Sequence, residues 1–314
     1  IFITGSSGFI GFHLSKKLLD DGHSIHGFDS MNNYYDIKLK KARYQILIKY
    51  KKFSFTKGNL ENQKTINNSI IKFKPKVIIH LAAQAGVRYS IDNPLIYLKT
   101  NVMGTYNVIE AAKKIKAKHL MIASSSSVYG ANKKLPFKET DKTETQLSMY
   151  AATKKSTESI AHSYSNIWKV PITMLRFFTV YGPWGRPDMA MYIFTKKISS
   201  EKPIYVFNNG DMFRDFTYID DIVSGLRSAL SKNYKCEVFN LGNSKTEHLM
   251  NVIKIIEKKI NIKAKIIFDE IKPGDVKKTF ADIDYSKKKL EYRPKTTIEK
   301  GIPQFIDWYI NFSK

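Results

Sequence analysis

The chain has 314 residues, of which 43% are hydrophobic and 13% aromatic, and its 52 Lys and Arg residues against 28 Asp and Glu give a net charge of +24. This composition excludes a disordered or collagen-like chain, and the length predicts roughly two domains. Arg, the residue that nucleic-acid-binding proteins use for bidentate contacts, is a small minority of the basic residues, and the lysines are scattered. We therefore interpret the charge as solvated lysines that also attract an anionic small substrate, with no nucleic-acid partner.

Cys236 is the single cysteine, which excludes an intrachain disulfide and a cysteine metal cluster. It lies in an apolar run, so we expect a buried core thiol. No apolar stretch approaches the ~18 residues that a membrane-spanning helix needs, and the histidines form no HxxxH pair. We expect no membrane partner, no metal, a few residues before Ile1, no signal peptide and a cytoplasmic location.

The first half of the chain alternates apolar, strand-like segments with amphipathic helices. Strands are predicted at residues 1–4, 24–29, 53–57, 77–81, 120–124 and 172–178, and helices at residues 9–20, 95–116 and 149–168. Apolar strands that are joined by helices form a parallel sheet covered on both faces. The sequence therefore predicts an α/β fold with a Rossmann-type doubly wound parallel sheet.

The alternation of strand and helix patterns stops after residue 178, where Gly, Pro and aromatic residues become frequent. We assign residues 215–230 and 237–241 back to the main sheet. A helix over 246–260, a strand over 264–268 and a last helix over 298–312 are expected to form a smaller lobe. We therefore predict a dinucleotide-binding domain over residues 1–178, to which 213–242 return, and a mainly substrate-binding lobe over 179–314.

A glycine-rich turn follows the first strand directly. Gly5 allows a tight turn, Gly8 lets backbone N–H groups approach a pyrophosphate, and Gly11 lets the helix pack closely on the strand. Asp29 ends the second strand, where a carboxylate accepts hydrogen bonds from a ribose 2′-hydroxyl and repels a 2′-phosphate. The pattern predicts a dinucleotide site that prefers NAD to NADP.

A second motif pairs Tyr150 with Lys154 at helical i, i+4 spacing, which places both side chains on one face. A lysine ammonium beside a phenol lowers the pKa of the tyrosine and makes it a usable general base. A run of serines over residues 124–127 ends the fifth predicted strand, and ligands bind at the carboxyl ends of strands in such sheets. We therefore expect Tyr150, Lys154 and these serines to share one site.

With these motifs the sequence resembles the extended short-chain dehydrogenase/reductase family and, within it, the nucleotide-sugar epimerases. The resemblance covers nearly the whole chain and includes the segments 80–83, 101–105, 176–178, 181–183, 214–216 and 273–275. It implies bound NAD, a UDP-sugar substrate and a homodimer formed through the helices that hold Asn101 and Tyr150.

The resemblance also implies a role for each matching residue. Tyr150 is the base, Lys154 binds the nicotinamide ribose and activates Tyr150, and Ser125 hydrogen-bonds the reacting sugar hydroxyl. The implied cofactor-binding residues are Gly5, Gly8, Phe9, Ile10, Gly11, Asp29, Asn32, Asn59, Leu60, Leu81, Ala82, Ala83, Asn101, Tyr150 and Lys154. The implied substrate-binding residues are Arg88, Ser126, Ser127, Thr179, Arg186, Tyr205, Val206, Phe207, Arg214, Lys272 and Asp275. Asn59 departs from the family, which has Asp there, so an amide oxygen would meet the adenine amino group.

The reaction type is indicated by Ser126 and Ser127, which follow the implied catalytic serine. The 4,6-dehydratases of the family carry Asp-Glu there, and the uronate decarboxylases carry Glu at the position of Ser127. Three adjacent hydroxyls instead suit a substrate carboxylate, because each can donate a hydrogen bond to it. Residues 179–190 are similar to UDP-glucuronate 4-epimerases, whereas galactose-type epimerases place Asn at Thr179. The resemblance thus implies 4-epimerisation of UDP-glucuronate to UDP-galacturonate.

Other readings stay open at this stage. The substrate could be a UDP-N-acetylhexosamine, a UDP-N-acetylhexosaminuronate or a neutral UDP-sugar, and the reaction could be the decarboxylation of UDP-glucuronate. A non-catalytic family member that binds RNA or a protein would exploit the net charge of +24. Such members commonly lose the Tyr/Lys pair, which is intact at Tyr150 and Lys154. We therefore rank an enzyme first.

Overall fold

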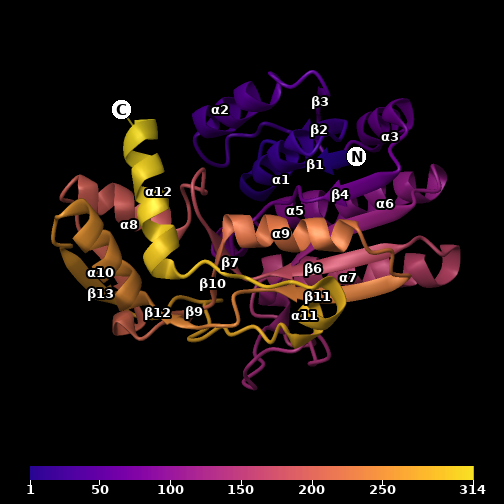
Figure 1. The fold of residues 1–314 in the computed structure, drawn as a ribbon. Helices are drawn as coiled ribbons and strands as arrows, with labels where there is room; N and C mark the ends of the chain where they lie inside the picture. The colour runs from indigo at the N-terminus through magenta and orange to yellow at the C-terminus, as the bar shows by residue number, and fades with distance from the viewer. Residues whose placement is uncertain (314) are drawn as a thin grey trace.

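The computed structural model describes residues 1–313 and contains a seven-stranded parallel sheet in the order β11-β6-β5-β4-β1-β2-β3 (Figure 1). Its strands are β1 (Phe2–Thr4), β2 (Ile25–Asp29), β3 (Phe53–Lys57), β4 (Val77–His80), β5 (His119–Ser125), β6 (Ile172–Phe177) and β11 (Cys236–Leu241). The strand order reverses between β1 and β4, and a crevice forms at the carboxyl ends of the strands at such a switch point. The predicted Rossmann-type fold is confirmed.

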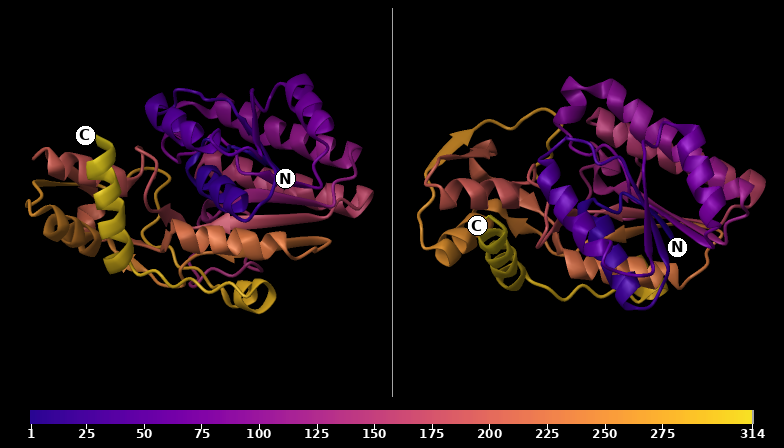
Figure 2. Two further views of the ribbon diagram at one scale, coloured as in Figure 1. Left: turned by 45° about the horizontal axis from the view of Figure 1, so that its top comes forward. Right: turned by 90° about the horizontal axis from the view of Figure 1, so that it is seen from above.

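Helices cover both faces of the sheet, because both faces of its strands are apolar. One layer is formed by α1 (Phe9–Asp20), α2 (Ile37–Leu47) and α9 (Ile219–Leu230), and the other by α3 (Gln63–Phe73), α6 (Gly104–Lys114) and α7 (Met149–Trp168). The right view of Figure 2 shows the strands between these two layers. Each layer buries its own hydrophobic cluster against the sheet.

The long helix predicted over residues 95–116 is confirmed in its extent, but it is not a regular α-helix throughout. After the short α4 (Tyr89–Asp92), it begins as α5 (Pro94–Tyr97), passes without a break through a π-helical turn (Leu98–Met103) and continues as α6 to Lys114. The π turn holds the buried Asn101, whose amide donates to the carbonyl of Gln84 at 3.0 Å and accepts from its N–H at 2.8 Å. The wider turn thus aims Asn101 at the loop after β4.

The lobe lies at the left of Figure 1 and is built from short strand pairs and three helices. The strand pairs are β7 (Thr179–Tyr181) with β10 (Phe216–Tyr218), β8 (Ile204–Phe207) with β13 (Ile266–Asp269), and β9 (Phe213–Arg214) with β12 (Glu247–His248). The helices are α8 (Ala190–Ser199), α10 (Leu249–Ile260) and α12 (Ile298–Ser313), whereas α11 (Asp284–Leu290) packs on β11. Within residues 213–242, β11 joins the main sheet and α9 (Ile219–Leu230) packs on α1, as predicted, but β10 pairs with β7 outside the main sheet, so the assignment of that strand to the main sheet is wrong. The domain division at residue 178 stays a prediction.

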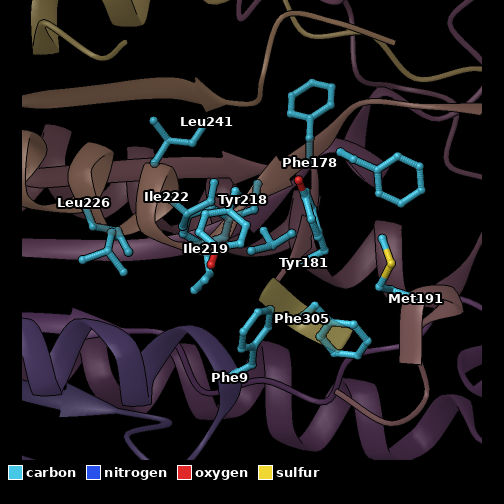
Figure 3. Packing of buried hydrophobic residues seen from close by; sticks show 14 of the residues in the cluster. Phe9, Phe178, Tyr181, Met191, Tyr218, Ile219, Ile222, Leu226, Leu241 and Phe305 are labelled. Carbon is cyan, nitrogen blue, oxygen red and sulfur yellow. The ribbon is translucent and has the colours of Figure 1, made fainter. Parts of the chain in front are cut away.

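One hydrophobic cluster runs from the sheet into the lobe (Figure 3). Phe9 of α1 and Ile222 of α9 belong to the same cluster as Met191 of α8 and Phe305 of α12, with Tyr181 of β7 between them. Because buried apolar side chains pack densely, this shared core holds the lobe against the sheet. The walls of the crevice are therefore fixed by packing on both sides.

The single cysteine lies at the edge of the sheet. Cys236 is half-buried on the edge strand β11, with its sulfur 3.3 Å from Nδ1 of His162, so the prediction of a buried core thiol is wrong.

Among the described residues, no helix combines the length and the apolar character needed to cross a membrane.

Candidate active site

A cleft of about 1110 Å³ opens at the carboxyl ends of the sheet strands, between the sheet and the lobe. All of the predicted site residues line it except Asn101, Val206 and Lys272. Its wall combines glycine backbone, aromatic rings and serine hydroxyls with basic side chains. The basic residues are Lys40, Arg88, Lys154, Arg186, Lys197 and Arg214. Such a mixed lining suits a large ligand with apolar rings and anionic groups.

The glycine-rich turn takes the form that its sequence predicts. Gly5 has φ +74°, and a Cβ there would lie 2.8 Å from the backbone nitrogen of Ala82. A Cβ on Gly11 would overlap the carbonyl oxygen of Gly5, so only glycine lets α1 start this close to the turn. Gly8 precedes α1, and no side chain of residues 1–313 caps its first turn. The free N–H groups at this helix start suit a phosphate.

Asp29 is buried at the end of β2, next to this turn. Its carboxylate accepts from the N–H of Ser7 at 3.1 Å and from the N–H of Met31 at 2.9 Å. These bonds orient the carboxylate at the cleft, which it lines together with Asn32 and Asn59. The acid is thus held where an adenosine ribose would lie in a Rossmann site.

Three predicted residues lie outside the cleft. Asn101 holds the backbone of the cleft residue Gln84 and also donates to Thr153 Oγ1 at 3.1 Å, so any support of a cofactor is indirect. Val206 is fully buried because side chains alternate along β8, which leaves Tyr205 and Phe207 at the cleft. The Lys272 ammonium pairs with Asp269 at 2.8 Å and lies above the Phe207 ring at 5.4 Å.

Tyr150 and Lys154 lie on the first two turns of α7, which begins at an N-cap where Ser148 Oγ accepts from Ala151 N–H at 3.1 Å. The Lys154 ammonium is buried and donates to the carbonyl of Ala123 on β5 at 2.8 Å. Burial lowers the pKa of Lys154 to about 8, and the Glu158 carboxylate opposes this change. The lysine is thus a buried cation at the floor of the cleft.

Burial raises the pKa of Tyr150, since a phenolate is poorly solvated in the cleft. The Ser125 hydroxyl and the nearby positive charge of Arg186 oppose that rise, but the pKa stays above its ordinary value, so the lowered pKa that the sequence predicts for Tyr150 is wrong. Ser125 itself is held by a bond to Ser127, whose N–H donates to Ser125 Oγ at 3.2 Å. The structure therefore brings the predicted catalytic residues Ser125, Tyr150 and Lys154 together at one point.

The serine run divides in two at the end of β5. Ser125, Ser126 and Ser127 line the cleft, and Ser125 Oγ donates to Ser127 Oγ at 3.2 Å. Ser124 also lines the cleft, but its Oγ donates to the buried Glu158 Oε1 at 2.6 Å, and Glu158 lies behind the cleft wall. Thr179 lines the same cleft from β7. Hydroxyl donors thus gather beside Tyr150.

Arg186 reaches the cleft from the loop after β7 and forms an ion pair with Asp188. Tyr34, from the loop after β2, donates to Asp188 Oδ2 at 3.2 Å, and burial together with the Asp188 charge raises the pKa of Tyr34 to about 12. This bond joins the sheet domain to the segment before α8 across the cleft. The sequence analysis did not include Tyr34 or Asp188 among the site residues. The two lie 154 positions apart, and the sequence around Tyr34 does not indicate that its hydroxyl bonds to Asp188.

At the far end of the cleft, Arg88 pairs with Asp275 at 2.6 Å and stacks over the Phe207 ring at 4.0 Å. Arg214 donates to the carbonyl of Phe213 at 2.9 Å, and burial lowers its pKa while the Asp275 charge opposes this. A planar ring and two guanidinium groups therefore meet there. These groups can stack on a nucleobase and neutralise phosphates.

Two further basic residues come from α2, a helix that the sequence reading did not predict. Arg43 is fully buried and donates to the carbonyl of Ser7 at 2.9 Å, and Lys40 donates to the carbonyl of Asn32 at 2.9 Å. Burial lowers the pKa of Lys40. Their i, i+3 spacing places both on one face of α2, but the apolar pattern of this helix is too weak to have indicated it from the sequence.

No group of three or more His, Cys, Asp or Glu side chains that could hold a metal ion occurs in the part of the chain that the structure describes. In His80, for example, both ring nitrogens are hydrogen-bonded to threonine hydroxyls. Its Nδ1 lies 2.7 Å from Thr4 Oγ1, and its Nε2 lies 3.0 Å from Thr105 Oγ1. The histidine therefore ties β1, β4 and α6 together.

Residues 2–305 match the family model described as GDP-mannose 4,6 dehydratase, and the chain belongs to this family of extended short-chain dehydrogenases/reductases. A probable UDP-glucuronate 4-epimerase of Rhizobium meliloti is 43% identical over 326 residues, which cover 98% of this chain and 96% of the relative. UDP-glucuronate 4-epimerase 4 of Arabidopsis thaliana is 41% identical over 332 residues, covering 99% of this chain and 75% of the relative. The crystal structure of UDP-glucuronic acid 4-epimerase from Bacillus cereus in complex with UDP-glucuronic acid and NAD matches with a TM-score of 0.94 and 34% identity, covering 99% of both chains.

Proposed function

We propose that the chain is an NAD-dependent epimerase that interconverts UDP-glucuronate and UDP-galacturonate by transient oxidation at carbon 4. The observation that carries the proposal is the row of hydroxyls Ser125, Ser126 and Ser127 beside Tyr150, with no carboxylate in the row. Such a row accepts an acidic sugar and lacks the acids that the dehydratases and decarboxylases of the family carry there. Relatives named as UDP-glucuronate 4-epimerases support the proposal.

The residues of the sheet domain fit NAD. The positive φ of Gly5 and the uncapped start of α1 leave backbone N–H groups for the pyrophosphate, and the oriented Asp29 carboxylate suits the adenosine ribose. Asn59 and Leu60 line the cleft beyond Asp29, where the adenine would lie. When bound, NAD supplies a hydride acceptor that also returns the hydride, so no external oxidant is consumed.

Tyr150 acts as the general base at the sugar. Its phenolate oxygen takes the proton of the 4-hydroxyl as the carbon 4 hydrogen leaves, and gives a proton back when the alcohol forms again. In the proposed mechanism the Lys154 ammonium, one helical turn after Tyr150, stabilises the phenolate, and Ser125 donates to or accepts from the same sugar oxygen. The three residues are therefore needed in both halves of the reaction.

The remaining polar groups bind and orient the substrate. Ser126, Ser127 and Thr179 offer hydroxyl donors to the sugar carboxylate. Different hydroxyls can bind this carboxylate before and after the 4-keto sugar rotates in the site. Arg186 and Arg214 supply positive charge for the diphosphate. The Phe207 ring offers a stacking surface for the uracil.

Incubating the protein with NAD and each of four nucleotides tests the proposal: UDP-glucuronate, UDP-glucose, UDP-N-acetylglucosamine and UDP-N-acetylglucosaminuronate. We expect UDP-galacturonate from UDP-glucuronate, no net NADH and no carbon dioxide. Faster turnover of any of the other three nucleotides, or UDP-xylose with carbon dioxide, would reject the proposed substrate or reaction.

Replacing Asp29 by Asn is expected to weaken NAD binding by roughly tenfold, because charge-assisted hydrogen bonds to the ribose become neutral ones. The ratio of NADP to NAD affinity should rise, because the repulsion of a 2′-phosphate is removed. Isothermal titration with both cofactors measures this. Asp20→Asn, at an exposed carboxylate on α1, is the matched control and should leave both affinities unchanged.

We further propose that the protein works in the cytosol, as its single cysteine suggests, and as a homodimer through α6 and α7. Apolar side chains are exposed along this face, including Leu95, Leu98, Met103, Tyr106, Ile167 and Trp168. An exposed apolar face of this kind marks a protein interface. The double variant Leu98→Glu with Met103→Glu is expected to be monomeric by light scattering, and Ile310→Glu, at an exposed position on α12, should stay dimeric. A monomeric parent protein would refute the dimer.

A further inference from the structure

The helix that carries the proposed catalytic pair has a third residue on the same stripe. Tyr150, Lys154 and Glu158 recur every four residues along α7. The Lys154 ammonium donates to the carbonyl of Ala123 at 2.8 Å, and Ser124 Oγ donates to Glu158 Oε1 at 2.6 Å. Consecutive residues of β5 are therefore bonded to consecutive turns of α7. The next residue of the strand is Ser125, which lines the cleft with Tyr150.

Glu158 is held from a second strand as well. Arg176 of β6 donates from Nε to Glu158 Oε1 and from Nη2 to Oε2, both at 2.9 Å. Arg176 and Ser124 are register partners in the sheet, so the carboxylate bridges two neighbouring strands. The Glu158 and Arg176 side chains are 1% and 4% exposed, and Glu158 does not line the cleft. A bidentate, buried pair of this kind has one geometry.

We propose that Glu158 is a positioning residue of the active site, which locks the end of β5 to α7 through Ser124 so that Ser125, Tyr150 and Lys154 keep one arrangement. The inference rests on the proposed function for its activity readout. A displacement of about 1 Å at reacting groups costs up to ~100-fold in rate, so a lock at this place affects the chemical step more than substrate binding.

The charge of Glu158 has a second consequence at Lys154. The charged and titratable groups that act at the Lys154 ammonium are Glu158 on its own helix and His80 on β4, while Arg176 of β6 and Lys155 of α7 lie against Glu158. Burial lowers the pKa of His80 to about 3, so this histidine is neutral at physiological pH. Glu158 is therefore the carboxylate that keeps Lys154 protonated against its burial. Without that charge, less protonated lysine stabilises the Tyr150 phenolate.

The first test replaces Ser124 by Ala, which removes the hydrogen bond between β5 and Glu158. We expect kcat with UDP-glucuronate to fall about tenfold, with KM within about twofold of the parent value. Ser165→Ala is the matched control, because Ser165 is a similarly buried serine on α7, and its hydroxyl donates to the carbonyl of Lys235 at 2.7 Å, away from the cleft. The control should keep the parental kcat.

The second test removes the charge of Glu158 together with its partner, in the double variant Glu158→Gln with Arg176→Met, so that no unpaired cation is left in the core. The readout is the alkaline titration of Tyr150, measured as phenolate absorbance of the NAD-loaded protein minus that of the same background carrying Tyr150→Phe. We expect the apparent pKa of Tyr150 to rise, and the pH profile of kcat/KM to lose activity at both its acidic and its alkaline limb.

Thermal unfolding first shows whether each variant is folded. If the double variant is unfolded, the kcat of Ser124→Ala alone tests the inference. Equal kcat values for Ser124→Ala and Ser165→Ala, or an unchanged Tyr150 titration in a folded double variant, would overturn the inference. If the parent protein turns over none of the UDP-sugars, the proposed function fails separately, and the titration, which needs no substrate, still decides the role of Glu158.

Discussion

The Tyr150→Phe variant is expected to lose about 10³-fold in kcat, because positioned acid–base groups contribute roughly 10²- to 10⁴-fold and phenylalanine cannot carry the proton. NAD affinity should stay within about twofold, since the change removes one oxygen and leaves the ring, the glycine-rich turn and Asp29 in place. Steady-state kinetics and NAD titration of the same preparation give both numbers.

Tyr292→Phe is the matched control for this change. Tyr292 is also buried, and its hydroxyl donates to the carbonyl of Gly242 at 3.0 Å, outside the cleft. The control loses one buried hydrogen bond, worth about 1 kcal/mol of stability, and should keep the parental kcat. A Tyr150→Phe variant with more than a tenth of the parental kcat would remove Tyr150 from the role of base.

The Ser127→Glu variant is expected to lose about 10³-fold in kcat/KM for UDP-glucuronate. Two carboxylates about 4 Å apart repel by about 4 kcal/mol at the effective dielectric constant of a protein surface site, and each 1.4 kcal/mol is a factor of ten. A neutral UDP-hexose carries no such penalty. The ratio of kcat/KM for UDP-glucuronate to that for UDP-glucose is therefore the quantity to measure.

Ser127→Gln separates charge from size, because glutamine has the volume of glutamate without the charge. We expect this variant to lose about tenfold in kcat/KM for UDP-glucuronate, as a hydrogen-bond donor is displaced and the site is crowded. Equal losses in the two variants, or equal losses for both nucleotides in Ser127→Glu, would show that the sugar carboxylate does not lie at the serine row.

Much of the fold follows from local patterns that need no knowledge of contacts. The glycine spacing, the apolar strands and the helices over residues 9–20 and 149–168 are read correctly, because each element matches its own periodicity. The helix over residues 95–116 is also read correctly, but its π-helical turn was not predicted, because hydrophobic spacing carries no sign of the bonds between Asn101 and Gln84. The helices α2 and α3 were missed because their apolar stripes are short and interrupted by Lys and Asn.

The site residues, like the elements of the fold, were predictable where a local motif marks them and not where a distant contact places them. Residues within motifs, such as Gly5, Tyr150 and Lys154, lie together at the cleft. Contacts between segments far apart in the sequence were not predictable, because a side chain such as Tyr34 shows its partner Asp188 only in the folded chain. Likewise Val206 and Phe207 are adjacent in sequence, yet strand alternation sends one to the core and the other to the cleft.

The most direct test of the central claim uses UDP-glucuronate labelled with deuterium at carbon 4. If the hydrogen taken from carbon 4 is held in the closed site and given back to the opposite face, the label stays on carbon 4 of the UDP-galacturonate product. Nuclear magnetic resonance and mass spectrometry of the product locate the label. Full retention at carbon 4 is the predicted result, and a product that carries solvent hydrogen at carbon 4 would contradict the account.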